Sequence, residues 1–452
     1  MFMDILVING SPKGKFSITL QTSNYLQILH PEHHFEILNA GQSIKALEKD
    51  FTPALEAIKK ADLLLFSYPV YTFVAPCQLH RFIELLKASK LDLSGIFASQ
   101  ISTSKHFYDI TAHRYIEDNC HDLGLKYIKG LSADMDDLTT DKGRSEAEKF
   151  FDYLCWCIQK GIYEPAPAAV PPFIPKEVKV PAPSNDAKSG DVVILTDCEE
   201  DNTQLQHMID RFRTVLPRKT RLINIREYPF RGGCLGCFNC AVSGKCIYKD
   251  GFDDYLRNEI QTAESIVYAF SIKDHSMGAR FKMYDDRNFC NGHRTVTIGM
   301  PVGYLIAGPY SCETNLQTIL EGRAQVGSNI LSGIATDEAD TDAAIDRLAE
   351  SLTYSLEHKN TGPQNFLGIG GMKIFRDLIW QMQGLMREDH RFFKSHGQYD
   401  FPQKKRGRMM AMYLVGGLMG NAKLQKKMGN KMNEGMLMPY KALFDKLDKQ
   451  GK

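Results

Sequence analysis

Four cysteines lie close together in the second half of the chain, at Cys234, Cys237, Cys240 and Cys246. Their spacing, C-x2-C-x2-C-x5-C, places three thiolates in a compact turn with a fourth nearby. Four thiolates can hold a [4Fe-4S] cluster, and they can also form a tetrahedral zinc site. Because zinc sites more often pair two CxxC motifs across a longer stretch, a cluster is the first prediction. A zinc site and an unmetallated turn remain the alternatives.

A second candidate site is the loop at residues 9–19, between a short apolar run and a helical segment. Glycines permit a tight turn there, and hydroxyls and amides at a helix N-terminus can hold a phosphate with help from the helix dipole. Ser17 is also expected to cap the helix. A plain strand-to-helix turn would use the same residues, so the spacing alone leaves both interpretations open.

Two further loops carry side chains suited to a flat ring. Residues 67–73 contain three aromatic residues and a proline, which could flank a planar ring system. Residues 102–108 offer hydroxyls, a cation and the imidazole of His106. Ordinary packing against a core, and a structural role for His106, are the competing interpretations.

These loops need regular elements to position them, and the apolar runs supply candidates. Short apolar runs alternate with helical patterns, which indicates βαβ units and parallel sheets. We expect strands at 4–8, 35–38, 63–66, 95–101 and 125–128, and again at 192–195, 220–225, 265–269, 304–307 and 329–334. The same order of events therefore occurs twice, which predicts two doubly wound domains in tandem.

A proline-rich stretch separates the two rounds. Residues 163–189 hold seven of the 19 prolines, and proline fixes φ and removes a backbone donor. We therefore predict domains at 1–162 and 190–360, an extended linker at 163–189, and a helical extension at 361–452. The extension is rich in methionine, and residues 401–452 carry 12 Lys or Arg against three Asp or Glu. A packed helix with a basic flank, a surface for homo-oligomers and an anionic membrane face all fit this segment.

Composition excludes several classes of protein. The 452 residues carry 55 Lys or Arg and 54 Asp or Glu, so no overall charge favours nucleic acid. No apolar run reaches the length of a membrane span, and the first ten residues do not resemble a signal peptide. Eleven cysteines, an odd number, argue against a disulfide framework. We therefore expect a cytoplasmic protein without a transmembrane segment.

The loop at residues 9–19 and the loop at residues 67–73 together resemble the corresponding loops of a known family. Gly10-Ser11-Pro12-Lys13 with Ser17 and Thr19, followed by Pro69-Val70-Tyr71, look like the signature of the flavodoxin-like NAD(P)H-dependent FMN reductases, over residues 3 to about 155. The resemblance implies flavodoxin-like sheets of strand order 2-1-3-4-5. It also implies FMN-binding residues: on the phosphate side Ser11, Lys13, Ser17, Ile18 and Thr19, and on the ring side Pro69, Val70, Tyr71, Thr72, Ser102, Thr103 and Tyr108. The compact loop and the lack of a dinucleotide fingerprint favour FMN over FAD.

The cysteine motif, followed by Asp250 and Asp253, resembles that of the iron–sulfur flavoproteins, which are relatives of these reductases. Residues 277–287, and the stretch from Lys373-Ile374-Phe375-Arg376-Asp377 to Asp400-Phe401-Pro402, look similar to the same proteins. The resemblance implies electron transfer between a [4Fe-4S] cluster and FMN, with the cysteine motif close to the flavin of a neighbouring subunit.

Each half departs from the family pattern in a complementary way. The second half has four carboxylates within residues 197–201, where a phosphate loop is expected, and Ser271-Ile272-Lys273 in place of Pro-Val-Tyr. Desolvated carboxylates would repel a phosphate. The first half has no cysteine at residues 39–42. We therefore predict a fused pseudo-dimer in which the loop at 233–246 faces the Pro69–Phe73 side of the first domain.

The sequence thus favours a flavin-dependent oxidoreductase that takes electrons from NAD(P)H through FMN, with a possible cluster relay to a small-molecule or protein acceptor. Flavin reduction requires no protein acid or base, so the sequence names no catalytic residue. The alternative is a non-catalytic binding protein with a degenerate second domain and a structural zinc or bare cysteine loop.

Overall fold

The computed structural model describes residues 2–168, 170–183, 187–419 and 431–450. The chain forms two compact units, Met1–Phe393 and Lys394–Lys452, which are described separately. The strands of the first unit are β1 (Asp4–Asn9), β2 (His34–Leu38), β3 (Leu63–Pro69), β4 (Phe97–Ser104), β5 (Lys126–Tyr127), β6 (Leu131–Asp134), β7 (Ser189–Thr196), β8 (Arg218–Asn224), β9 (Ser265–Ser271), β10 (Pro301–Ala307) and β11 (Ile330–Thr336).

Helices alternate with these strands. They are α1 (Ile18–Leu29), α2 (Ala40–Leu47), α3 (Thr52–Lys60), α4 (Cys77–Ala88), α5 (Asp109–Asp122), α6 (Asp141–Lys160), α7 (Thr203–Val215), α8 (Asn239–Ser243), α9 (Phe252–Tyr255), α10 (Gly278–Asn288), α11 (Thr314–Gly327), α12 (Thr341–His358), α13 (Phe366–Gln381) and α14 (Arg387–Ser395). The second unit contains α15 (Arg406–Met419) and α17 (Lys431–Lys449).

The strands form two parallel sheets with the same topology. The first has the order β2-β1-β3-β4-β5, with β6 also paired to β4, and the second has the order β8-β7-β9-β10-β11. In each sheet the first strand of the domain lies between the second and the third, so both follow the order 2-1-3-4-5 of flavodoxin-like proteins. This confirms the predicted fold class of two tandem doubly wound sheets with a helical C-terminal region.

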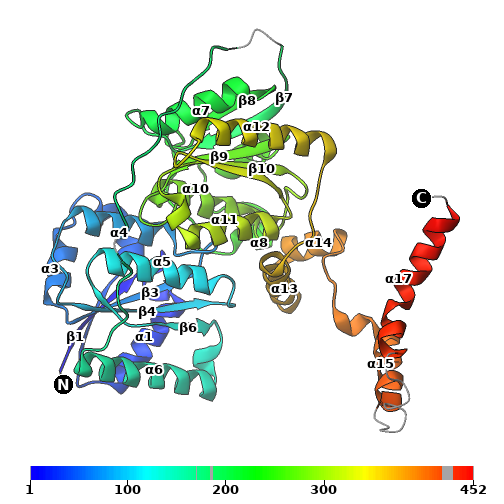
Figure 1. The fold of residues 1–452 in the computed structure, drawn as a ribbon. Coiled ribbons are helices and arrows are strands. Elements are labelled where there is room, and N and C mark those ends of the chain that lie inside the picture. The colour runs from blue at the N-terminus through cyan, green and yellow to red at the C-terminus, as the bar shows by residue number, and fades with distance from the viewer. Residues whose placement is uncertain (1, 169, 184–186, 420–430, 451–452) are drawn as a thin grey trace. The chain divides into compact units, whose positions relative to one another are not determined.

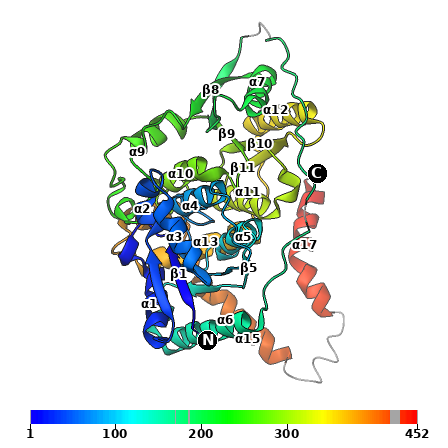
Figure 2. The same cartoon turned by 90° about the vertical axis from the view of Figure 1, so that its left-hand side faces the viewer.

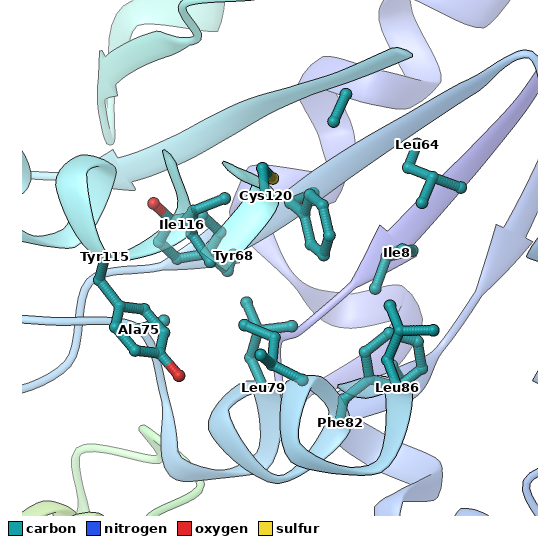
Figure 3. Close-up of a cluster of buried hydrophobic side chains, with 14 of the residues drawn as sticks. Ile8, Leu64, Tyr68, Ala75, Leu79, Phe82, Leu86, Tyr115, Ile116 and Cys120 are labelled. Carbon is teal, nitrogen blue, oxygen red and sulfur yellow. The ribbon is translucent and has the colours of Figure 1, made fainter. Parts of the chain in front are cut away.

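Apolar residues on both faces of the strands explain the layers. All residues of β3 from Leu63 to Tyr68 are buried, as expected for a strand covered by helices on both sides. On one face, Leu79, Phe82 and Leu86 of α4 recur at helical spacing and pack toward Ile8 and Leu64 (Figure 3). On the other face, α1 and α6 complete a separate core.

Helices α4 and α10 hold the two sheets together, and both ribbon views place them side by side (Figures 1 and 2). The Asp286 carboxylate of α10 accepts a hydrogen bond from the Cys77 amide at the start of α4. In return, the Glu84 carboxylate of α4 accepts one from the Ala279 amide at the start of α10. Each domain therefore caps a helix of the other, as two subunits related by a twofold axis would.

The proline-rich stretch has no helix or strand among its described residues from 162 to 188. The Lys176 amide donates to the Asp337 carbonyl, and Val178 is buried in the core of the second sheet. Residues 169 and 184–186 of the predicted linker lie outside the described residues, as do 420–430 and 451–452 of the predicted extension.

The second unit is helical and presents apolar side chains. Met410, Met412, Tyr413 and Leu414 of α15 are exposed, and the predicted role of this region in self-association stays a prediction. None of the described helices combines the length and the apolar character that a membrane span requires.

Candidate functional site

A cavity of about 370 Å³ lies at the carboxyl ends of the first sheet's strands, where the second domain closes over them. Its walls include most residues predicted to bind the cofactor, namely Ser11, Lys13, Ser17, Ile18, Thr19, Pro69, Val70, Tyr71, Thr72 and Thr103. They also include Cys234, Cys237, Cys240 and Cys246. The residues predicted to bind the flavin and the cysteine loop thus line one cavity, which is the proximity predicted for a fused pseudo-dimer. Its volume falls within the ordinary range for a small-ligand site.

Polar side chains fix the first loop of the cavity. The Asn9 amide nitrogen donates to the Gly14 carbonyl at 3.0 Å and to Asn39 Oδ1 at 2.8 Å. Ser11 Oγ accepts from the Lys13 amide at 3.3 Å. As predicted, Ser17 caps α1, because its Oγ accepts from the Leu20 amide. The hydroxyl of Ser17 therefore lies at the N-terminus of a helix of 12 residues, and Ser11 lines the same cavity. This arrangement suits a phosphate.

The second loop is a tight turn from Tyr71 to Val74, closed by two backbone hydrogen bonds between these residues. Thr72 and Phe73 both have positive φ, 40° and 76°. This is a type I′ turn, which glycine or asparagine usually occupies. Non-glycine residues in this conformation store of order 1–3 kcal/mol of strain each, and such strain gathers at ligand sites. The surrounding structure must therefore hold the turn in place.

Buried charged side chains of α10 hold the turn from Tyr71 to Val74 in place. The ammonium group of Lys282, which is fully buried, donates to the Tyr71 carbonyl at 3.0 Å and to Thr72 Oγ1 at 2.7 Å. Lys282 also pairs with Asp286, which accepts from Thr72 Oγ1 at 2.8 Å. Burial lowers the pKa of Lys282, and Asp286 opposes that effect. The second domain thus shapes the predicted ring-binding turn of the first.

The cysteine loop lies against this turn. Gly236 has a φ of 60°, and a Cβ there would collide with the Tyr71 hydroxyl. The Lys13 ammonium lies 5.7 Å from the ring centroid of Phe238. Burial, together with the neighbouring Cys234, raises the pKa of the Tyr71 phenol. Contacts with both Lys13 and Tyr71 therefore dock the cysteine loop on both predicted halves of the flavin site.

Acidic residues after the motif anchor the loop. Asp253 Oδ2 accepts from the Cys246 amide at 2.9 Å. Asp250 forms a bidentate pair with Arg287 at 2.7 and 2.8 Å, and it accepts from the Arg231 amide. Asp250 and Asp253 therefore organise the backbone of the loop.

The four thiols do not converge on one point. Cys234 Sγ accepts from the Gly236 amide at 3.4 Å, and Cys240 Sγ donates to the Phe289 carbonyl at 3.3 Å. Burial raises the pKa of Cys240 to about 11, and it raises that of Cys234 as well. Among the described residues, no three His, Cys, Asp or Glu side chains are placed to hold a metal ion. The conformation described here does not by itself fit a metal.

Two residues predicted to bind the cofactor lie away from the cavity walls. Ser102 Oγ bonds His113 Nε2 at 2.7 Å inside the protein. The Tyr108 hydroxyl donates to the Leu367 carbonyl at 3.0 Å, and its ring packs on Phe73. Both side chains support the loops around the cavity. Their predicted contact with the cofactor gains no support from this placement.

Sequence reasoning missed a His–Asp pair in the same cavity. His293 lines it, and its Nδ1 lies 2.9 Å from Oδ2 of the fully buried Asp389 of α14. The Asp389 carboxylate also accepts from the His293 amide at 3.2 Å. A carboxylate at Nδ1 fixes the tautomer of an imidazole, so that Nε2 is the atom left for proton transfer. No sequence signal joins two residues 96 positions apart.

Arg323 of the second domain and the ring of Phe375 in α13 also contribute to the walls. Arg323 pairs with Asp285 and lies 5.5 Å from the ring centroid of Phe73. Phe375 stacks on Phe107 of the first domain at 4.3 Å. Phe375 belongs to the stretch from Lys373 to Pro402 that resembles the iron–sulfur flavoproteins. The sequence therefore indicated this part of the cavity wall.

No family model and no curated protein matches the chain. Among solved structures, an NADH:FMN oxidoreductase in its apo form is 18% identical, with a TM-score of 0.30 over 36% of this chain and 91% of its own. An FMN-dependent NADH-azoreductase from Bacillus anthracis, in complex with FMN, is 16% identical, with a TM-score of 0.27 over 33% and 98%. An NAD(P)H:quinone oxidoreductase from Methanothermobacter marburgensis is 12% identical, with a TM-score of 0.28 over 36% and 98%. Similarities at this level of identity and TM-score do not assign the chain to a family. The functional proposal therefore rests on the residues of the cavity.

Proposed function

We propose that this protein is a flavin-dependent oxidoreductase that binds FMN in the cavity between its two domains and accepts electrons from NADH or NADPH. The observation that carries the proposal is the meeting of two features in one cavity. Hydroxyls lie at the N-terminus of α1, and a strained aromatic turn lies across the cavity at Tyr71–Val74.

The residues of the cavity suit the two ends of FMN. One end of the cavity combines buried hydroxyls, a cation and a helix N-terminus, which suit the phosphate. The residues that would surround the phosphate there are Ser11, Lys13, Ser17, Ile18 and Thr19. Pro69, Val70, Tyr71 and Thr72 would lie along the ring. Thr103 completes the wall, whereas Ser102 and Tyr108 act on it indirectly.

Bound FMN would supply the hydride chemistry, and the protein would supply orientation and exclude water. Tyr71 and Phe73 form an aromatic wall, held by Lys282 and Asp286. His293 lines the cavity and its Nδ1 bonds Asp389, so Nε2 is the imidazole nitrogen left to exchange a proton with a substrate.

We further propose that Cys234, Cys237, Cys240 and Cys246 ligate a [4Fe-4S] cluster, which would relay electrons within one chain. The motif spacing and the shared cavity support this, and the thiols would have to move toward one another on binding. A structural zinc is the competing occupant, and a binding protein without redox chemistry is the competing function.

Cofactor analysis of anaerobically purified protein tests the proposal. We expect one FMN per chain, identified against FAD by chromatography, and loss of its visible absorbance when NADH or NADPH is added. Iron, sulfide and zinc are measured on the same sample. A chain that binds no flavin after reconstitution would refute the enzyme proposal, whereas flavin with one zinc and no iron would refute only the cluster.

A further inference from the structure

A second cavity, of about 830 Å³, lies at the carboxyl ends of the second sheet's strands. The loop after β7 contributes Asp197 and Asn202, the end of β9 contributes Ser271, and the loop after β9 contributes Lys273. Helices α2 and α4 of the first domain close it. Its size also lies within the range of small-ligand sites.

This cavity repeats the architecture of the first, with the two domains exchanged. In each cavity, one domain supplies the loops that follow the first and third strands of its sheet. The other domain supplies the segment that follows its own second strand and the helix that follows its own third strand. The turns correspond too. Asp274 and His275 have φ of 52° and 61°, and two backbone hydrogen bonds join Lys273 and Ser276, as in the turn from Tyr71 to Val74.

The charges of the second cavity differ from those of the first. Acidic residues after β7 stand where the first sheet carries Ser11, Lys13 and Ser17. Asn202 caps α7 through the Leu205 amide and donates to Ser271 Oγ at 2.8 Å. The position that suits a phosphate in the first domain therefore presents carboxylates in the second.

Most cations around this cavity already have partners. Arg81 pairs with Glu48 and Glu84, and Lys273 also approaches Glu84, at 3.4 Å. Arg226 pairs with Glu199 and donates to the Asp197 carbonyl. The Arg280 guanidinium donates to three backbone carbonyls, of Ile225, Arg226 and Tyr228.

Asp197, by contrast, forms no ion pair with any residue that the structure describes, and its half-buried side chain lines the cavity. An unpaired carboxylate in a cavity is costly unless a bound group compensates it. Functional sites retain such groups when a ligand supplies the missing partner.

We propose that the second cavity is a ligand site for a small organic cation, an ammonium or an amidinium, which the Asp197 carboxylate binds. The inference is independent of the flavin proposal, because it uses a different cavity and a different sheet. It also explains why the second domain keeps a full crevice without a phosphate loop.

The charge state of Asp197 gives the site a characteristic pH dependence. Burial raises the pKa of Asp197 to about 7, against the effect of Arg226 and with a smaller contribution from Glu199 and Glu84. Arg280 also faces Asp197. A cation binds the ionised form, so binding below pH 7 must release a proton.

Benzamidinium, benzamide and benzoate are suitable probes, because they share one shape and differ in charge. We expect calorimetry to show at least tenfold tighter binding of benzamidinium than of the other two by the wild-type protein at pH 8. Its affinity should fall about fivefold between pH 7 and pH 6, with a proton released into the buffer. Asp197→Asn should abolish the preference, whereas Glu200→Gln, which removes a charge outside the cavity wall, should keep it.

Equal binding of the three probes, tighter binding of benzoate, or an unchanged preference in Asp197→Asn would overturn the proposal. So would a second FMN per chain displaced by benzamidinium. If Asp197→Asn fails to fold, the pH dependence and proton release of the wild-type protein still decide the matter.

Discussion

Asp286 of α10 accepts a hydrogen bond of 2.7 Å from the amide of Cys77, which begins helix α4 of the other domain. The two residues are 209 positions apart. Glu84 and Ala279 form the reciprocal bond at the same distance. Asp286 also neutralises the buried Lys282 and accepts from Thr72, so one carboxylate joins the domain interface to the predicted ring-binding turn.

Asp286→Asn should therefore destabilise the whole first unit. It leaves the buried Lys282 ammonium without its nearest charge partner, and breaking a buried pair costs about 3 kcal/mol or more. Urea unfolding measures the loss. Glu48→Gln is the matched control, because it breaks the more exposed pair with Arg81 and should cost under about 1 kcal/mol. Equal losses in both variants would show that the buried pair contributes no more than the exposed one.

Ser11→Asp should weaken FMN binding at least tenfold. The new carboxylate would lie in the loop that we propose for the phosphate, and like charges repel strongly in a partly desolvated site. Fluorescence titration of the apoprotein measures the dissociation constant. Ser94→Asp adds the same charge at an exposed position and should leave the constant unchanged. If both variants bind FMN as the wild type does, the phosphate assignment fails.

Cys240→Ala should remove most of the bound iron, because a cubane cluster needs its full set of thiolates in most proteins. Metal and sulfide analysis of anaerobic protein gives the readout. Cys312→Ala removes a solitary exposed thiol and should retain the wild-type iron content. Iron that survives Cys240→Ala unchanged would place the ligands elsewhere.

Gly236→Ala tests the contact between the cysteine loop and the ring turn. The added methyl group meets the Tyr71 hydroxyl, so Tyr71 must shift and FMN affinity should fall several-fold. Gly161→Ala is the control for backbone strain, because Gly161 also has a positive φ, of 66°, but open space around its Cβ position. Both variants should lose roughly 1 kcal/mol of stability. Only Gly236→Ala should change flavin binding, and a parallel change in Gly161→Ala would contradict the steric explanation.

His275 should stabilise the domain interface in a pH-dependent manner. Burial by itself lowers the pKa of His275, but hydrogen bonds to Asp122 and Glu313 outweigh burial and raise it to about 10. Because the folded protein binds this proton more tightly than the unfolded chain, the stabilisation is complete below pH 6.5 and disappears as the pH rises to about 10.

His275→Gln should accordingly lower the free energy of unfolding by about 2 kcal/mol at pH 6, allowing for the exposure of Asp122, and by little at pH 10. His34→Gln, at an exposed pair with Asp4, should change it by under about 1 kcal/mol at either pH. Denaturant unfolding at several pH values gives the comparison, and a loss in His275→Gln that does not vary with pH would exclude the ionic explanation.

The sequence alone determined the fold class and the position of the loops. Runs such as the one from Leu63 to Phe66 are apolar throughout, and only a parallel strand covered on both faces uses such a run repeatedly between helices. Parallel strands end at the same edge of a sheet, so the loops after β1 and β3 had to meet there. The spacing of the four cysteines and the cap at Ser17 are likewise local properties, which a sequence displays directly.

Tertiary structure alone decided which groups face one another across the domains. Lys282, Asp286 and Arg323 have the sequence pattern of ordinary charges on helices. Only the packing of the second domain on the first buries Lys282 and Asp286 and half-buries Arg323. The pairing of His293 with Asp389 and the unpaired state of Asp197 depend in the same way on side chains brought together from distant positions. Local sequence fixes backbone preferences over a few residues, whereas burial and electrostatic partners arise from the docking of whole layers, and no spacing in the chain encodes that docking directly.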